Sequence, residues 1–156
     1  MNGSVFFGES VAVRILDRQD QSVEKLKKRE DGKHMERFRM ELESLSKNEE
    51  FARVVVAVFM SRLDPTLEEI DDVKTAVSEA VTNAEIHGYG GEGGIITVEV
   101  ETEGKKLTVV VEDYGVGIRD IEKAMEPMFT TDKSGTRSGM GFSFMEAFMD
   151  EIHVES

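Results

Sequence analysis

The sequence predicts an α+β fold, a two-layer α/β sandwich in which helices cover one face of a mixed, mostly antiparallel sheet. Two stretches in the first half of the chain repeat apolar residues at helical spacing. Segments 95–102 and 106–113 alternate apolar and polar residues and are separated by a turn around Glu103-Gly104, the pattern of an antiparallel hairpin. Helices with one apolar stripe and strands with one apolar face bury both by packing as two layers.

The first regular elements of the predicted domain are a strand and a helix. Over 38–42, apolar residues alternate with charged ones, which predicts a strand with one buried face. Ser46 followed by Glu49 is a capping-box pattern, so we expect a helix to begin here and to run to about Leu63. Its apolar residues recur at helical spacing: Phe51, Val54, Val55, Val58 and Phe59.

A second helix is expected to run to about His87. Asp64-Pro65 interrupts the chain, and proline suits the first turn of a new helix. Thr66 with Glu69 offers another capping box. The glycine-rich stretch 88–94 then ends the helix as a turn.

The elements after the hairpin are shorter. We expect a short helix near 119–126, a polar loop from Pro127 to Ser138, a helix over 140–150 and the start of a strand over 152–154. These elements complete the order of the two-layer sandwich.

Charge and patterning divide the chain near Met35. The 156 residues are 39% hydrophobic and 33% charged, enough for one domain with a real core. Residues 1–34 contribute +1 to the net charge and leave −14 for residues 35–156. The first segment holds one strand-like alternation over 11–15 and then a polar stretch. We interpret residues 1–34 as an appendage of unknown role, derived from an upstream start or a fusion, and residues 35–156 as the functional domain.

Composition excludes several classes of partner and site. A net charge of −13 argues against nucleic acid or an anionic membrane as the main partner, because both favour clustered Lys and Arg. The chain has no cysteine, which rules out disulfides and thiolate metal sites. No apolar run is long enough for a membrane span, and the first residues do not resemble a secretory leader. A cytoplasmic location is therefore expected.

Three polar residues share one border of the second helix. Glu79, Asn83 and His87 stand at i, i+4 and i+8, beside the apolar face. A carboxylate there could accept a proton from an attacking hydroxyl, and an amide oxygen could complete a Mg²⁺ shell of waters and phosphate oxygens. Alternatively, the three are ordinary polar residues at the edge of an amphipathic helix.

Two glycine-containing motifs complete a candidate nucleotide site. D-Y-G-V-G at 113–117 ends a strand, where a carboxylate can accept the amine of adenine and glycines let the backbone approach the ring. R-S-G-M-G at 137–141 precedes a helix whose free N–H groups could bind phosphate. Each motif alone also fits a simpler structure, a strand-ending turn for the first and an ordinary helix start for the second. The polar segment 127–137 fits a flexible lid, but it also fits a surface loop. Their order along one chain favours the nucleotide site.

These motifs resemble the anti-sigma F factors, a family within the GHKL superfamily of ATPases and kinases. The resemblance covers nearly all of residues 35–156, and it is carried by S-K-N-E-E-F-A-R-V at 46–54, L-D-P-T at 63–66, S-E-A-V-T-N-A at 78–84, H-G-Y at 87–89, M-F-T-T at 128–131 and R-S-G-M-G-F at 137–142.

The resemblance implies a Bergerat-type ATP site of the GHKL superfamily. It implies Glu79 as general base, Asn83 as Mg²⁺ ligand and Asp113 on adenine, with His87 at the family's matching position. The remaining implied site residues shape the pocket or surround the phosphates, with Arg137 also catalytic: Gly115, Gly117, Thr130, Thr131, Arg137, Ser138, Gly139, Met140 and Gly141.

The resemblance also implies an activity and partners. The family sequesters a sporulation sigma factor as a dimer and uses ATP to phosphorylate a serine on its anti-anti-sigma antagonist. It has a final strand after the position of Ser156 that is missing here, and the alternation over 11–15 could fill that sheet position. Two alternatives remain, the catalytic domain of a sensor histidine kinase and a non-catalytic ATP-dependent binding module. A histidine kinase would need a phospho-accepting His in a two-helix segment, which His34 and His153 do not provide.

Overall fold

The computed structural model describes residues 2–7, 12–14, 35–127 and 141–156, the first two segments as backbone only. Within these residues, strands form a single sheet in the order β2-β6-β1-β5-β4-β3. Only β2 and β6 pair in parallel, so the sheet is mixed and mostly antiparallel, as expected. The strands are β1 (Asn2–Phe7), β2 (Ala12–Arg14), β3 (Met35–Glu43), β4 (Ile95–Glu103), β5 (Lys106–Asp113) and β6 (Glu151–Glu155).

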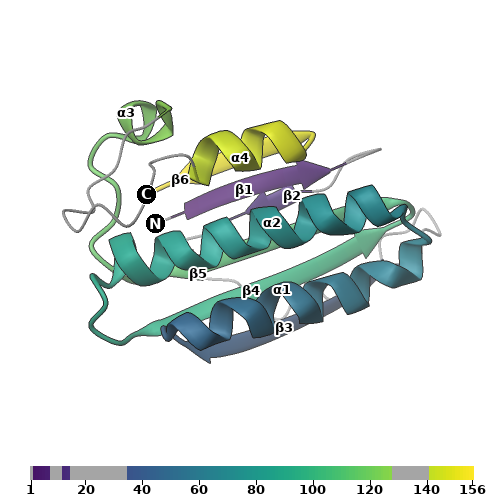
Figure 1. Ribbon diagram of the computed structural model, residues 1–156, viewed down its shortest axis with the longest axis horizontal. Coiled ribbons are helices and arrows are strands. Elements are labelled where there is room, and N and C mark those ends of the chain that lie inside the picture. Colours follow the sequence, from purple (N-terminus) through teal and green to yellow (C-terminus); the bar gives the residue numbers. More distant parts are fainter. Residues whose placement is uncertain (1, 8–11, 15–34, 128–140) are drawn as a thin grey trace.

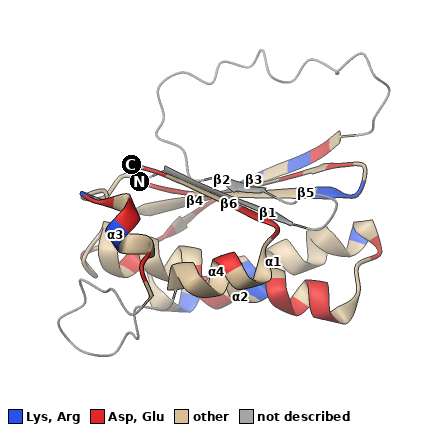
Figure 2. Cartoon of the chain, turned by 90° about the horizontal axis from the view of Figure 1, so that it is seen from above, with Lys and Arg blue, Asp and Glu red and all other residues tan. Residues whose placement is uncertain are grey.

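The helices α1, α2 and α4 lie on one face of this sheet, which confirms the two-layer α+β sandwich (Figure 2). Short turns of other helix types follow the first two helices. In order, the helical elements are α1 (Ser46–Met60), the 3₁₀ turn η2 (Ser61–Leu63), α2 (Leu67–Asn83), the π turn η3 (Ala84–Gly88), α3 (Ile121–Met125) and α4 (Gly141–Phe148). Among the helices in the described part of the chain, none has the length and apolar character that a membrane span requires.

The two expected capping boxes have different outcomes. At α2 the box is present, because Glu69 N donates to Thr66 Oγ1 over 3.1 Å and Thr66 N donates to Glu69 Oε2 over 2.7 Å. At α1 the prediction is wrong. The N-cap is Leu45, with no side-chain cap, and the Glu49 carboxylate accepts a hydrogen bond from the Ser78 hydroxyl of α2 instead. Glu49 thus joins two helices rather than capping one.

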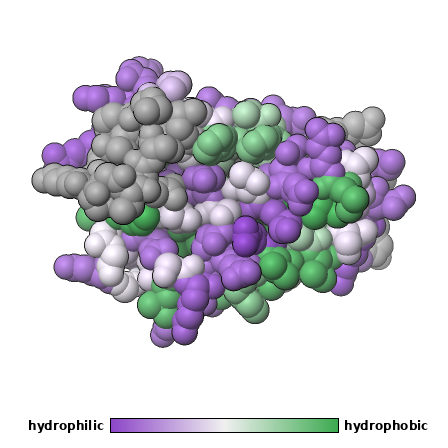
Figure 3. All heavy atoms as spheres, viewed as in Figure 1, coloured by the Kyte–Doolittle hydropathy of each residue, from purple (hydrophilic) through white to green (hydrophobic). Residues whose placement is uncertain are grey.

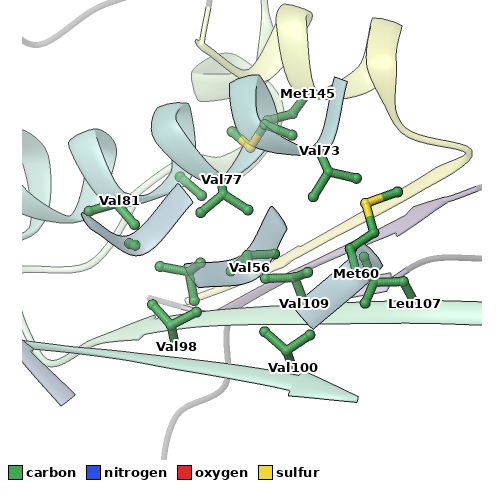
Figure 4. Packing of buried hydrophobic residues seen from close by; sticks show 14 of the residues in the cluster. Val56, Met60, Val73, Val77, Val81, Val98, Val100, Leu107, Val109 and Met145 are labelled. Atoms are coloured by element: carbon green, nitrogen blue, oxygen red, sulfur yellow. The ribbon is translucent and has the colours of Figure 1, made fainter. Parts of the chain in front are cut away.

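The core lies between the helices and the β4–β5 hairpin (Figure 4). Valines from both layers are fully buried, and each contributes about 1.5–3 kcal/mol to the free energy of unfolding through burial. Gly104 has a φ of +62° in the two-residue turn that pairs Glu103 with Lys106, as the hairpin prediction requires. The rigid layer so formed holds β5 beneath α2, and β5 ends at Asp113.

The N-terminal segment contributes two strands to the sheet, one of them unexpected. The alternation over 11–15 becomes β2, an edge strand beside β6. Residues 2–7, for which no strand was predicted, form β1 between β5 and β6, antiparallel to both. Asn2 pairs with Glu155, so the two ends of the chain lie close together (Figure 1).

Candidate functional site

Two polar residues of α2 meet the start of α4. Glu79 and Asn83 stand one helical turn apart, and the Asn83 side chain is buried. A Cβ added to Gly141, the first residue of α4, would lie 2.9 Å from Glu79 Oε2 and 3.3 Å from either polar atom of the Asn83 amide. The fold therefore brings a carboxylate, an amide and the N-terminus of a helix into contact, although α2 and α4 are far apart in sequence.

The polar border of α2 changes pitch before it reaches His87. The α-helix ends at Asn83 and continues as the π turn η3, which is closed by Tyr89 N donating to Ala84 O over 3.1 Å. The expected i, i+4, i+8 stripe assumed a regular α-helix and is therefore wrong for its third member. His87 is half-buried within η3. π turns are frequent at functional sites, because they reposition the side chains that follow.

Asp113 forms the second part of the site, at the end of β5. Its side chain is 1% exposed, and its Oδ1 accepts a hydrogen bond from Gly115 N over 2.9 Å. Burial raises the pKa of Asp113 above its usual value, while the hydrogen bond from Gly115 lowers it by a smaller amount. A carboxylate in this position gains from any ligand that donates a hydrogen bond to it, such as the exocyclic amine of adenine.

Glycines let η3 and the loop after β5 touch through their backbones. A Cβ on Gly115 would lie 1.9 Å from the Gly88 carbonyl oxygen, which also accepts a hydrogen bond from Val116 N over 2.8 Å. A Cβ on Gly88 would lie 2.6 Å from Asp113 Oδ1. A larger residue at Gly115 would push this loop away from η3, and a larger residue at Gly88 would displace the Asp113 carboxylate.

The other end of the loop is held by Ser156, the residue that follows the last strand, β6. Ser156 Oγ accepts a hydrogen bond from Ile118 N over 2.7 Å and lies 2.8 Å from the position of a Cβ on Gly117. Gly117 has a φ of +73°, which favours glycine. Ser156 and Gly88 were not predicted as site residues, because their contacts join segments that are remote in sequence.

Comparison with known proteins identifies the family that has this architecture. A model of the histidine kinase-like ATPase domain matches residues 38–156. The chain is 62% identical to the anti-sigma F factor of Clostridium acetobutylicum over 120 residues, which cover 76% of this chain and 84% of that protein. It is also 58% identical to the anti-sigma F factor of Clostridium novyi over 121 residues, or 77% of this chain and 85% of that one. The chain belongs to the anti-sigma F factor family.

The match to the histidine kinase-like ATPase domain, over residues 38–156, includes every residue of the site just described. Of the phosphate-side residues that the sequence predicts, only Gly141 lies in the described part of the chain. The others lie outside the described residues: Thr130, Thr131, Arg137, Ser138, Gly139 and Met140. The described residues contain no group of three or more His, Cys, Asp or Glu side chains that could hold a metal ion.

Proposed function

We propose that this chain is an anti-sigma factor that sequesters a sporulation sigma factor and phosphorylates a serine of its anti-anti-sigma antagonist with ATP. The observation that carries the kinase activity is the closeness of Gly141, at the start of α4, to the side chains of both Glu79 and Asn83. It joins a proton acceptor, an amide ligand and a helix N-terminus, the groups that a phosphoryl transfer needs. The partners are inferred from relatives named as anti-sigma F factors.

ATP fits the arrangement at both ends of the site. Asp113 would accept the adenine amine. Gly115 and Gly117 let the loop beside the proposed adenine position pack closely against Gly88 and Ser156, because a Cβ at either glycine would meet those residues. The first turn of α4 contains no acidic residue, so its free N–H groups can face phosphate. The predicted phosphate-side residues, with Arg137 among them, immediately precede that turn in sequence.

In the proposed reaction, the oxygen of a partner's serine attacks the γ-phosphorus of ATP. Glu79 accepts the serine proton, the new P–O bond forms, and the bond to the β-phosphate oxygen breaks to release ADP. Arg137 would neutralise charge on the γ-phosphoryl group. Asn83 is the proposed ligand of Mg²⁺, which supplies charge neutralisation of the phosphate oxygens when it is bound. We assign this catalytic domain to residues 35–156, with a cytoplasmic location. Residues 1–34 have no assigned function beyond the strands β1 and β2 that they add to the sheet.

We also propose a homodimer formed through region 37–63. Phe51, Val54 and Val58 lie on one face of α1 and are 54%, 46% and 65% exposed. Apolar surface is visible over the side on which α1 and α2 lie (Figure 3), and β3 is an outer strand of the described sheet. A second copy of the chain would bury this stripe through a symmetric contact.

Val58→Asp should weaken this dimer at least about tenfold, because it places a charge within an apolar contact. Sedimentation across a concentration series measures the change. Leu67→Asp is the matched control, since Leu67 is 81% exposed at the start of α2, outside the proposed contact. An unchanged association constant for Val58→Asp would exclude α1 as the interface.

The experiment that tests the function is phosphotransfer with labelled ATP, Mg²⁺ and a candidate anti-anti-sigma protein. The expected product is phosphoserine on the partner, stable to acid, at a site lost when that serine becomes alanine. Label on a histidine would support a sensor histidine kinase instead. ATP binding without transfer to any partner would support the non-catalytic module. His153 is a poor acceptor, because it lies in β6 with Nε2 2.5 Å from Glu155 Oε1, outside any helical segment.

A further inference from the structure

A tyrosine hydroxyl stands where the hairpin ladder should continue. The turn at Gly104 makes Glu103 and Lys106 a hydrogen-bonded pair, and such pairs alternate along an antiparallel ladder. The pairing of β4 with β5 stops at Ile96 and Asp113. Ile95 and Tyr114 would form the next hydrogen-bonded pair.

Tyr89 inserts its hydroxyl between these two residues. The hydroxyl donates to Ile95 O over 2.5 Å and accepts from Tyr114 N over 2.9 Å. One phenol oxygen thus replaces the direct bond between the two backbones and holds the end of β5 away from β4. The ring packs closely against Gly94, where an added Cβ would lie 2.3 Å from it.

The inserted hydroxyl controls the peptide group that follows the candidate adenine ligand. Tyr114 N belongs to the peptide bond that joins Tyr114 to Asp113, and the next amide, Gly115 N, is held by Asp113 Oδ1. Consecutive amides are therefore fixed by Tyr89 and by Asp113. The orientation of the Asp113 carboxylate depends on both bonds, since they set the backbone from which its side chain projects.

We infer that Tyr89 is a positioning residue for adenine recognition, a role that rests on the proposed ATP site. Without the hydroxyl, Tyr114 N can donate directly to Ile95 O. The pairing of β4 with β5 then extends by one residue pair, and the Asp113 carboxylate turns away from the base. Tyr89 acts on binding, because it lies at the adenine end and touches none of Glu79, Asn83 and Gly141 in the hydrogen bonds and glycine contacts described.

The test is a thermodynamic cycle that combines the substitution Tyr89→Phe in the protein with removal of the adenine amine from the nucleotide. The probes are ATP and the purine riboside triphosphate that lacks this amine, and dissociation constants are measured by calorimetry. Tyr89→Phe should weaken ATP binding roughly tenfold but change binding of the amine-free analogue by less than about threefold. Phosphotransfer at saturating ATP should stay within about twofold. Equal losses for both nucleotides would overturn the role and leave Tyr89 as a support of stability alone.

Tyr114→Phe is the matched control. It removes the only other tyrosine hydroxyl of the chain, which donates to Glu112 Oε1 over 2.7 Å and takes no part in the inserted bond. Its two nucleotide affinities should change in parallel. If Tyr89→Phe does not fold, amide hydrogen exchange of the wild-type protein decides, because Tyr114 N–H must be protected and an unprotected amide would overturn the inference. Failure of the wild type to bind ATP would instead reject the proposed function.

Discussion

At the adenine end of the candidate site, backbone packs against backbone, whereas at the phosphate end a helix start faces the tips of two side chains. A Cβ added to Gly115 would lie 1.9 Å from the Gly88 carbonyl oxygen. A Cβ added to Gly141 would lie 2.9 Å from the Glu79 carboxylate and 3.3 Å from the Asn83 amide. The adenine end is therefore built to hold one geometry. The phosphate end leaves its chemical groups able to adjust to a reacting phosphoryl group, so changes at the two ends should have separable effects.

The largest expected effect is on transfer, at the phosphate end. Glu79→Gln keeps the shape of the side chain but cannot accept a proton, so phosphotransfer should fall ~10²–10⁴-fold, or about 3–5 kcal/mol in activation free energy. The dissociation constant of ATP should be unchanged. Single-turnover transfer and calorimetry measure the two quantities.

Glu85→Gln serves as the control for this substitution, because Glu85 lies in the neighbouring π turn and has no proposed role. Full transfer by Glu79→Gln would remove Glu79 as the base. Parallel loss of binding and transfer would make it a residue at the polar border of α2 with a structural role only.

The next effect is on binding, at the adenine end. Asp113→Ala should abolish the stabilisation by Mg-ATP, which is ~2.7 kcal/mol for a wild-type protein at a hundredfold excess over the dissociation constant. Thermal melting with and without nucleotide measures it. Asp71→Ala, an exposed change on α2, should leave the shift intact. An undiminished shift in Asp113→Ala would refute the adenine assignment.

A pair of glycine substitutions compares the two ends directly. Gly115→Ala must displace the Gly88 backbone, so it should cost about 1–3 kcal/mol of unfolding free energy and weaken ATP binding. Gly141→Ala meets the movable end of Glu79, so it should cost less than about 1 kcal/mol while slowing transfer. Urea denaturation measures the free energy of unfolding of both variants. Equal destabilisation would show that the two ends are equally rigid.

Local patterns predicted most of the fold, because their causes are close in sequence. The capping box at Thr66 and the two-residue turn at Gly104 each involve residues within a few positions, and both are present. The box expected at Ser46 failed because Glu49 bonds Ser78, which is 29 residues away. Competition from a remote residue is invisible to a local pattern.

The candidate site follows the same rule. The D-Y-G-V-G motif predicts Asp113 and its glycines as site residues, and the helix pattern predicts Glu79 and Asn83. The contacts that assemble them, from Gly88, Tyr89 and Ser156, join segments that no spacing rule connects. The insertion of β1 between β5 and β6 is a further case, since a short segment shows no preference for one sheet position over another.

The smallest expected effect concerns the stability of the nucleotide-free protein. Because burial raises the pKa of Asp113 above 3.8, the folded state holds this proton more tightly than the unfolded state. The free energy of unfolding therefore falls as pH rises from 3.8 through the raised pKa, and stays lower above it. Asp113→Asn cannot ionise and escapes this loss. It should be the more stable protein at neutral pH without nucleotide, and the difference should vanish below about pH 4. Urea midpoints measured across this range, with no ATP present, test the sign. A wild type that is more stable at neutral pH would show that the adenine end stabilises the ionised carboxylate without its ligand, and the rigid end of the site would then be complete before ATP binds.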